Sequence, residues 1–324
     1  MAGGFFGLDI AVRGLFTAHR NLDIVNHNLS NVNTEGYSRQ VAEQKATRPL
    51  SLFDGTGMIG TGSEVIAIKR MRDEYLDFKF WSEHDTYGQW EVKNMLFGEI
   101  QAIFNEPSDS GFSKVMDDFF SALQELSKDP SSETTRTLVR QKGVTLAKYF
   151  NSAAAHLEKI QSDINYNINL KVNEINSLAA QIQSLNKQIF NFELDGSSAN
   201  DLRDQRTLLV DKLSKIINID AREVVVGTTS EGRDITHFVV SINGKDLVNH
   251  FELCQLKVTQ RQNKLNEEDI ENLYEISWED GNKLEIRNGE LKGYIDMRDG
   301  NEGENGSPAY KGVPYYIKKL NQFV

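Results

Sequence analysis

The histidines and the single cysteine are the side chains that a metal site or a catalytic nucleophile would use most readily. No histidine has a partner at the HExxH spacing that places two zinc ligands on one helix face. Cys254 stands in no recognisable nucleophile motif and, as the only cysteine, cannot form an internal disulfide. We therefore expect no enzymatic activity, no metal and no cofactor. The histidines are His19, His27, His84, His156, His237 and His250.

A cluster of glycines could suggest a phosphate-binding loop. However, the chain has neither a GxxxxGK[ST] motif nor a strand-loop-helix order around these residues, so we interpret the cluster as an ordinary loop. The glycines are Gly55, Gly57, Gly60 and Gly62.

Acidic residues are abundant, but nearly all fall on the predicted polar faces of helices. A catalytic carboxylate pair stays open as an alternative.

Composition narrows the classes of partner. The 324 residues allow two or three domains. The net charge of -11 argues against nucleic acid as a partner, because affinity for phosphates depends on Lys and Arg. No apolar stretch approaches the length of a membrane span, so we expect no membrane insertion. The N-terminus lacks the basic start and apolar core of a cleavable secretory signal, so export would use another route.

Apolar residues near the N-terminus follow a heptad pattern, which gives the first predicted helix. Spacings of three and four predict a helix of about 25 residues with one narrow apolar stripe, which needs a partner helix to be buried. The simpler interpretation is an ordinary core helix. The stripe consists of Leu8, Ala11, Leu15, Ala18, Leu22, Val25, Leu29 and Val32.

Residues 26–40 are dense in Asn and Ser, which compete for backbone hydrogen bonds and favour caps and turns. The helix should end there, with Gly36 supplying a positive φ. Residues 37–47 are extended in character, and Val65, Ile66 and Ile68 predict a returning strand. This hairpin must lean on helices, because a lone hairpin is marginally stable.

The rest of the chain contains segments with helical periodicity, followed by segments with strand-like composition. Helices are predicted over 71–105, with an interruption near Gly88, over 112–126, from Ser131 or Ser132 onward, over the heptad run 164–192, and over 200–217. Strands are predicted over 223–226, 238–242, 253–258, 274–278 and 284–286. A flexible polar linker over 301–308 then leads to a helix that starts at Val313.

These patterns predict an α+β protein in which long heptad-patterned helices form an elongated helical bundle with a β-hairpin, plus a small β-rich domain. We expect four parts. They are an N-terminal assembly helix with its Asn-rich connection (1–38), the helical bundle domain with the hairpin (39–218), the β-rich domain (219–300), and a linker with the start of a returning helix (301–324).

Two sets of motifs resemble a known family. Gly14-Leu15 and the run NLSNVNTEGYSRQ at 28–40 closely resemble the start shared by flagellar rod, hook and hook-associated proteins, an amphipathic helix followed by an NNxxNxxTxGY-like loop. His27 stands where that pattern more often has Asn. The later motifs are similar to the FlgK family of hook-associated proteins, whereas rod and hook proteins resemble only the first block. These motifs are 117–123 with Arg136, 201–206 with Leu213, and 289–293 with Arg298-Asp299 and Val313-Pro314.

The resemblance implies a structural subunit of the bacterial flagellum that joins hook to filament. It implies a secreted, extracellular protein, exported by the flagellar type III system and polymerised through its terminal helices. Its implied partners are further copies of itself, the hook protein, a second hook-filament junction protein, and the export apparatus with its chaperone.

The implied assembly residues lie on the first helix and in the loop after it. We expect the stripe residues to pack against neighbouring helices in the tubular flagellar polymer. We expect the loop residues to set the angle between the helix and the hairpin that follows it, although simple capping would also explain the asparagines. The assembly helix residues are Leu8, Leu15, Leu22, Val25 and Leu29, and the connection residues are Asn28, Ser30, Asn31, Gly36 and Tyr37.

The chain departs from the family at its end. Family members close with a second heptad helix that pairs with the first, whereas this sequence stops at Val324 as its returning helix begins. We expect an N-terminal fragment or a truncated product.

Two alternatives to a hook-filament junction subunit stay open. One is another axial protein, such as a hook or rod subunit or the filament-side junction partner. The other is a host-binding module in the β segment.

Overall fold

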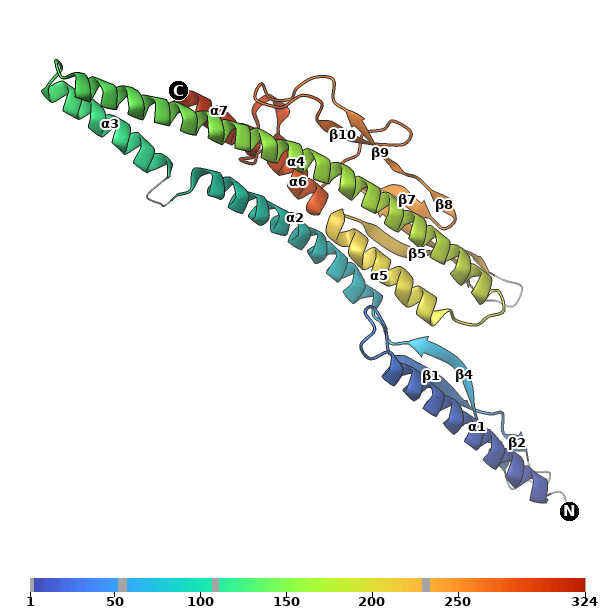
Figure 1. Ribbon diagram of the computed structural model, residues 1–324. Coiled ribbons are helices and arrows are strands. Elements are labelled where there is room, and N and C mark those ends of the chain that lie inside the picture. Colours follow the sequence, from blue (N-terminus) through green and yellow to red (C-terminus); the bar gives the residue numbers. More distant parts are fainter. Residues whose placement is uncertain (1–2, 52–56, 107–110, 229–233, 324) are drawn as a thin grey trace.

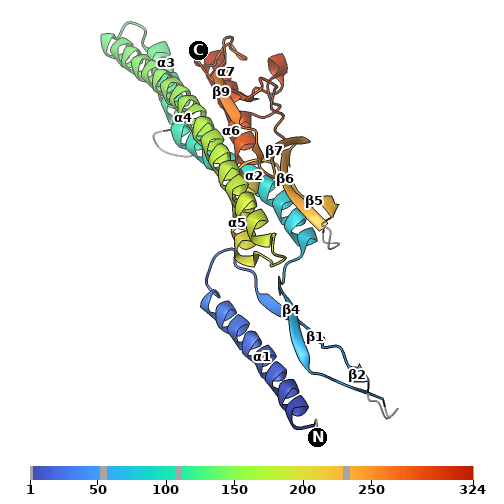
Figure 2. The same ribbon diagram turned by 90° about the vertical axis from the view of Figure 1, so that its right-hand side faces the viewer.

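The molecule is elongated, with the N-terminal helix at one end and a helical tip at the other (Figures 1 and 2). The computed structural model describes residues 3–51, 57–106, 111–228 and 234–323. Gly55 of the glycine cluster therefore lies outside the described residues, and so does Val324. The predicted α+β class, with long helices and small antiparallel sheets, is confirmed.

The N-terminal end consists of one helix lying on a hairpin. Helix α1 (Gly3–Ser30) packs along strands β1 (Gln40–Ala46) and β4 (Ser63–Arg70), which pair antiparallel. A smaller pair, β2 (Leu50–Ser51) and β3 (Met58–Ile59), extends the hairpin. The predicted helix, the turn after it and the returning strand are confirmed.

Helix α2 (Glu74–Phe104) continues without the interruption that the sequence suggested near Gly88. That prediction is wrong, because the glycine serves a close approach instead of a break. A Cβ on Gly88 would lie 2.3 Å from the carbonyl oxygen of Lys215, so only a residue without a side chain lets the two helices pass there.

The bundle is organised around one very long helix. Helix α4 (Glu133–Glu193) joins two stretches that the sequence suggested as separate helices, and the hydroxyl of Ser132 caps its start by accepting from the amide of Thr135 at 3.4 Å. Helix α3 (Phe112–Lys128) packs against its first half to form the tip. Helix α5 (Asn200–Ile216) packs against its last turns.

The strands after α5 lie on α4 and are held there partly by asparagines. Asn176 on α4 both donates to and accepts from the backbone of Leu256, at 2.8 and 2.9 Å. A four-stranded antiparallel sheet has the order β5-β6-β7-β8, and β9 pairs with β10. The strands are β5 (Asp220–Thr228), β6 (Asp234–Ile242), β7 (Lys245–Asn249), β8 (Glu252–Leu253), β9 (Leu256–Gln260) and β10 (Tyr274–Trp278).

Two predictions for the last third of the chain are wrong. Residues 284–286 form no strand, and helix α6 (Glu290–Asp299) follows them and packs between α2 and α4. The segment 301–308 is a compact hydrogen-bonded turn, since Asn301 is buried and its amide donates to the carbonyl of Pro308 at 3.3 Å. The helix from Val313 is confirmed as α7 (Val313–Phe323).

The apolar core runs through the bundle and the sheets together. Side chains from α2, α4, α5, α6, α7 and the strands after α5 form one buried cluster. Among the described residues, α1 and its hairpin contribute nothing to the buried clusters. The four domain boundaries stay predictions, since the core crosses the boundary placed at 218. No helix in the described part of the chain is both long enough and apolar enough for a membrane span.

Candidate functional site

Helix α1 has two different faces, and the one that contacts the hairpin is mainly polar. The hydroxyl of Thr17 donates to the carbonyl oxygen of Ser63 at 3.0 Å, and Ile24 is buried. Four residues further on, Asn28 contacts the start of β1. Sequence reasoning missed this face, because polar side chains at helical spacing normally indicate solvent.

The predicted apolar stripe is on the other side of α1 and faces outward. Its five assembly residues are between 57% and 70% exposed, so neither the hairpin nor the bundle covers them. The alternative of an ordinary core helix therefore fails for this chain. A continuous ridge of such side chains in water is typical of a surface that another helix covers. The residues are Leu8, Leu15, Leu22, Val25 and Leu29.

Asn28 connects the helix to the hairpin as a neighbouring strand would. Its Oδ1 accepts from the amide of Gln40 at 2.9 Å, and its Nδ2 donates to the Gln40 carbonyl at 2.9 Å. The hydroxyl of Tyr37 donates to the same Oδ1 at 2.7 Å. One amide side chain thus satisfies both backbone groups of the first residue of β1.

The remaining connection residues close the end of α1. Asn31 Nδ2 donates to the His27 carbonyl at 3.0 Å, and the hydroxyl of Ser30 donates to the Asn26 carbonyl at 2.8 Å. These two contacts are local caps. Asn28 does more than cap, since its partner lies twelve residues away in the next element.

Gly36 lies where the loop after α1 touches the bundle. Its φ of +76° is strained for other residues, and a Cβ there would lie 3.0 Å from Cβ of Leu208 on α5. The loop therefore approaches α5 closely at this residue.

A joint between the N-terminal part and the bundle is centred on Asp204 of α5. Its buried carboxylate accepts from the backbone amide of Ser38 at 2.8 Å and from Arg70 at 3.0 Å. Asp201, one turn earlier, accepts from the side chain of Gln40 at 2.6 Å. In the sequence, residues 201–206 could be identified only as a family motif, because nothing in the segment itself reveals which distant residues it contacts.

The two arginines of the 201–206 segment contact α4 and β5 instead of the hairpin. Arg203 makes two hydrogen bonds to the Glu193 carboxylate at 2.7 and 2.8 Å, and both Arg203 and Arg206 contact Glu223 on β5, at 2.8 and 2.6 Å. Burial alone would raise the pKa of Glu223, but the two guanidinium charges more than offset this effect and hold its pKa below the ordinary value. The block therefore ties α4, α5 and the sheet to the joint.

Two of the histidines take part in contacts that connect parts of the structure. In the part of the chain that the structure describes, no three His, Cys, Asp or Glu side chains are arranged to hold a metal ion. His27 contacts Tyr37 at 2.9 Å in the connection, and His84 contacts Ser214 at 3.0 Å between α2 and α5. Both are structural contacts between elements.

The comparison with protein families is decisive for the bundle. Residues 97–323 match the family described as the flagellar hook-associated protein FlgK helical domain. This chain belongs to the FlgK family of flagellar hook-associated proteins. The recognition made from motifs in the sequence is thus confirmed, and the family consists of structural components of the bacterial flagellum, an extracellular assembly.

Two FlgK relatives agree with this assignment. The chain is 35% identical to flagellar hook-associated protein 1 of Bacillus subtilis over 224 residues, covering 68% of this chain and 44% of the relative. The same protein of Salmonella typhimurium is 28% identical over 212 residues, covering 65% and 38%. The chain therefore spans less than half the length of these FlgK relatives.

The likeness in structure concerns the fold alone. The flagellar hook junction protein FlgK from Burkholderia pseudomallei matches with a TM-score of 0.52 at 20% identity, over 70% of this chain and 39% of that chain. The FlgK architecture of long helices with attached small sheets is therefore shared.

Proposed function

We propose that this FlgK family member is a structural subunit that joins the flagellar hook to the filament and polymerises through helix α1. The observation that carries the proposal is the outward-facing stripe of α1. The helix already uses a polar face against its own hairpin, so its apolar face is free for another helix.

Burial of the stripe would supply substantial driving force. Each side chain of this kind contributes on the order of 1.5–3 kcal/mol when it is fully buried, and the five residues are now more than half exposed. Translational entropy and the ordering of the helix offset part of this gain. Five such positions in one row are nevertheless sufficient to direct packing of α1 against neighbouring helices.

The joint at Asp204 has a separate role in this proposal. It fixes the direction in which α1 leaves the bundle, because Ser38 and Arg70, from the two sides of the hairpin, bind the same carboxylate. Asn28 then fixes α1 on the hairpin. We infer that the connection residues set the angle between α1 and the helical bundle.

The partners follow from this role. They are further copies of the same chain in one axial layer, the hook protein below it and a second hook-filament junction protein above it. Delivery occurs through the flagellar type III export apparatus with a chaperone.

A strain that lacks the gene tests the junction role directly. We expect it to build hooks but to release flagellin into the medium as monomer, and we expect the intact gene to restore attached filaments. Microscopy of hooks and immunoblotting of the medium measure both results. Normal attached filaments in the deletion strain would contradict the proposal.

A further inference from the structure

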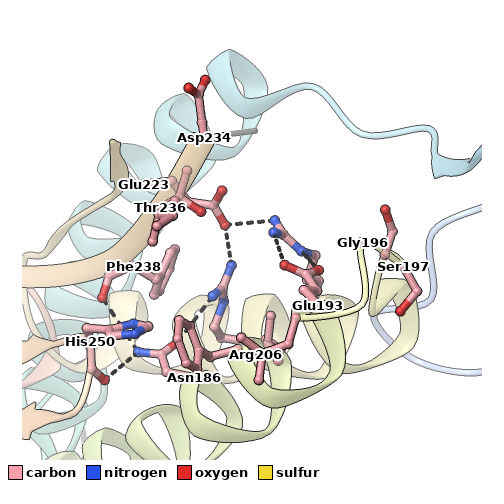
Figure 3. Close-up of a pocket in the computed structure, with 16 residues that line it drawn as sticks. Asn186, Glu193, Gly196, Ser197, Arg206, Glu223, Asp234, Thr236, Phe238 and His250 are labelled. Atoms are coloured by element: carbon pink, nitrogen blue, oxygen red, sulfur yellow. Dashed lines mark hydrogen bonds and ion pairs between the residues drawn. The ribbon is translucent and has the colours of Figure 1, made fainter. Parts of the chain in front are cut away.

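The turn between β7 and β8 connects the four-stranded sheet to α4. The amide of His250 donates to the carbonyl of Phe238 on β6 at 3.0 Å, and the His250 carbonyl accepts from Nδ2 of Asn186 on α4 at 3.0 Å (Figure 3). The next carbonyl in the turn, that of Phe251, accepts from Nε2 of Gln183 on α4 at 2.6 Å. The backbone of this turn therefore fastens the sheet to the long helix.

The imidazole of His250 holds the turn in its shape. The ring is stacked between His237 and Phe251, with centroids 3.9 and 3.7 Å away, and it meets Phe190 of α4 edge-on at 5.4 Å. The φ of +51° at His250 is a left-handed conformation that costs free energy for a residue with a side chain. Such a conformation persists only where surrounding contacts fix it, so the turn depends on the ring staying in the stack.

The stacked ring has no place for a second proton. Both of its nitrogens are buried, and neither reaches solvent or has a hydrogen-bond partner among the described residues. The residue as a whole is only 7% exposed. A buried cation without an acceptor is much less stable than a neutral ring. Protonation of His250 therefore favours departure of the ring from the stack.

The charges around His250 act in the same direction. Burial, followed by the charges of His237 and Arg206, lowers the pKa of His250 from 6.5 to about 4. Glu223 is bound to Arg206 at 2.6 Å and so does not pair with the ring. The closed turn therefore loses stability as the pH falls from about 6.5 toward 4, because only the opened turn binds the proton readily. The charged and titratable side chains of this region are Glu193 on α4, Arg203 and Arg206 on α5, Glu223 on β5, and Asp234 and His237 on β6.

We propose that the β7–β8 turn, residues 249–252, is an acid-sensitive clasp that fastens β7 and β8 to α4 and opens when His250 takes up a proton. With the ring in the stack the clasp is closed, whereas a protonated ring turns out to water and the turn loosens. In an extracellular assembly, the pH of the medium then sets how firmly these strands are attached. The clasp is independent of polymerisation through α1, so the two proposals stand or fall separately.

Native-state hydrogen exchange of the full chain tests the clasp. The probes are the amides of His250 and Cys254, which bond to the carbonyls of Phe238 and Leu247. Between pH 7 and pH 5 the opening constant at these amides should rise about twentyfold, after correction for the intrinsic exchange rate. The imidazole resonances of His250 should remain those of a neutral ring at both pH values. An unchanged opening constant, or a ring that titrates in this range while the amides stay protected, would overturn the proposal.

Two variants assign the acid response to His250. His250→Phe keeps a ring in the stack but binds no proton, so its opening constants at pH 7 and pH 5 should agree within about twofold. His250→Asn serves if Phe disturbs folding, because Asn tolerates the φ of +51° at this position. It should open more readily at both pH values, since the stack is lost, and should also show no acid response.

His237→Phe is the matched control. It keeps an aromatic ring in the stack and leaves His250 in place, so the rise in the opening constant between pH 7 and pH 5 should persist. A rise that survives in a folded His250 variant, or that disappears in His237→Phe, would contradict the role of His250.

Discussion

The carboxylate of Asp204 accepts a hydrogen bond from the backbone amide of Ser38, which lies 166 positions earlier in the chain, at 2.8 Å. The same carboxylate binds Arg70 on β4 at 3.0 Å. This single buried side chain therefore holds both sides of the N-terminal hairpin on the bundle. Since α1 and the hairpin add nothing to the apolar core of the described residues, polar contacts dominate the joint.

Replacing Asp204 with Ala should release the N-terminal part while the bundle stays folded. The loss leaves the Ser38 amide without its acceptor and Arg70 with only the hydroxyl of Thr207, at 3.3 Å, which should cost about 2–3 kcal/mol in the local opening free energy of the hairpin. Native-state hydrogen exchange at the amides of β1 and β4 measures this change. Asp201→Ala is the matched control, since Asp201 is exposed, and its effect should be smaller. Equal effects would place the joint elsewhere.

Replacing Leu22 and Val25 with Asp should abolish assembly without unfolding the bundle. Both side chains are exposed in the single chain, so the melting temperature should change by less than about 2 °C. Polymerisation should fail, because two carboxylates would be buried in an apolar contact. Filament attachment in a complemented deletion strain is the readout, and Arg20→Gln on the same helix serves as the control. Filaments that form normally would show that the stripe is not the assembly surface.

Replacing Gly36 with Val should disturb the loop at the joint. A β-branched residue at φ +76° is strained, and its Cβ would crowd Leu208, so we expect a cost of about 2 kcal/mol. Hydrogen exchange around residues 36–40 measures the change. Gly7→Ala provides a contrast, because nothing lies within 4 Å of its Cβ position, and there α1 should gain about 0.5–1 kcal/mol. Equal, small effects of both substitutions would show that Gly36 is not required.

Acid should weaken the bundle through the Arg203, Arg206 and Glu223 cluster. The folded-state pKa of Glu223 lies below its ordinary value of 4.5, so this group contributes stability above that pH and loses it as the pH falls through the lower folded value. Denaturant unfolding between pH 7 and pH 3 should show a decline below about pH 4.5. Glu223→Gln should be less stable at pH 7 but decline less, whereas Glu252→Gln on the exposed surface should match the parent. A parallel decline in Glu223→Gln would remove the cluster as the cause.

The local elements could be predicted from the sequence where one short-range signal determined them. The heptad pattern of α1, the Asn-rich turn and the cap at Ser132 each depend on neighbours within a few residues. The stripe of α1 could also be predicted, as a surface in need of a partner. Its role in assembly stays a prediction.

Contacts between distant residues could not be predicted in the same way. Gly88 suggested a helix break because the chain that crosses it, at Lys215, is more than a hundred residues away. Helix α6 was missed, since its ten residues include Gly293 and buried charges such as Asp296, whose partner Lys93 lies on α2 at 2.8 Å. The role of Asp204 depends on Ser38 and Arg70 for the same reason.

The uninterrupted course of α4 has a mechanical consequence. At 1.5 Å per residue its 61 residues form a rod of about 90 Å, and hydrogen bonds along its backbone resist stretching and bending over that whole length. Its last residue, Glu193, is bound to Arg203 beside Asp204. A load on α1 therefore reaches the rod by two routes, across Asp204 and α5 and along the chain from β4 into α2, and the rod transmits it toward the α3–α4 tip.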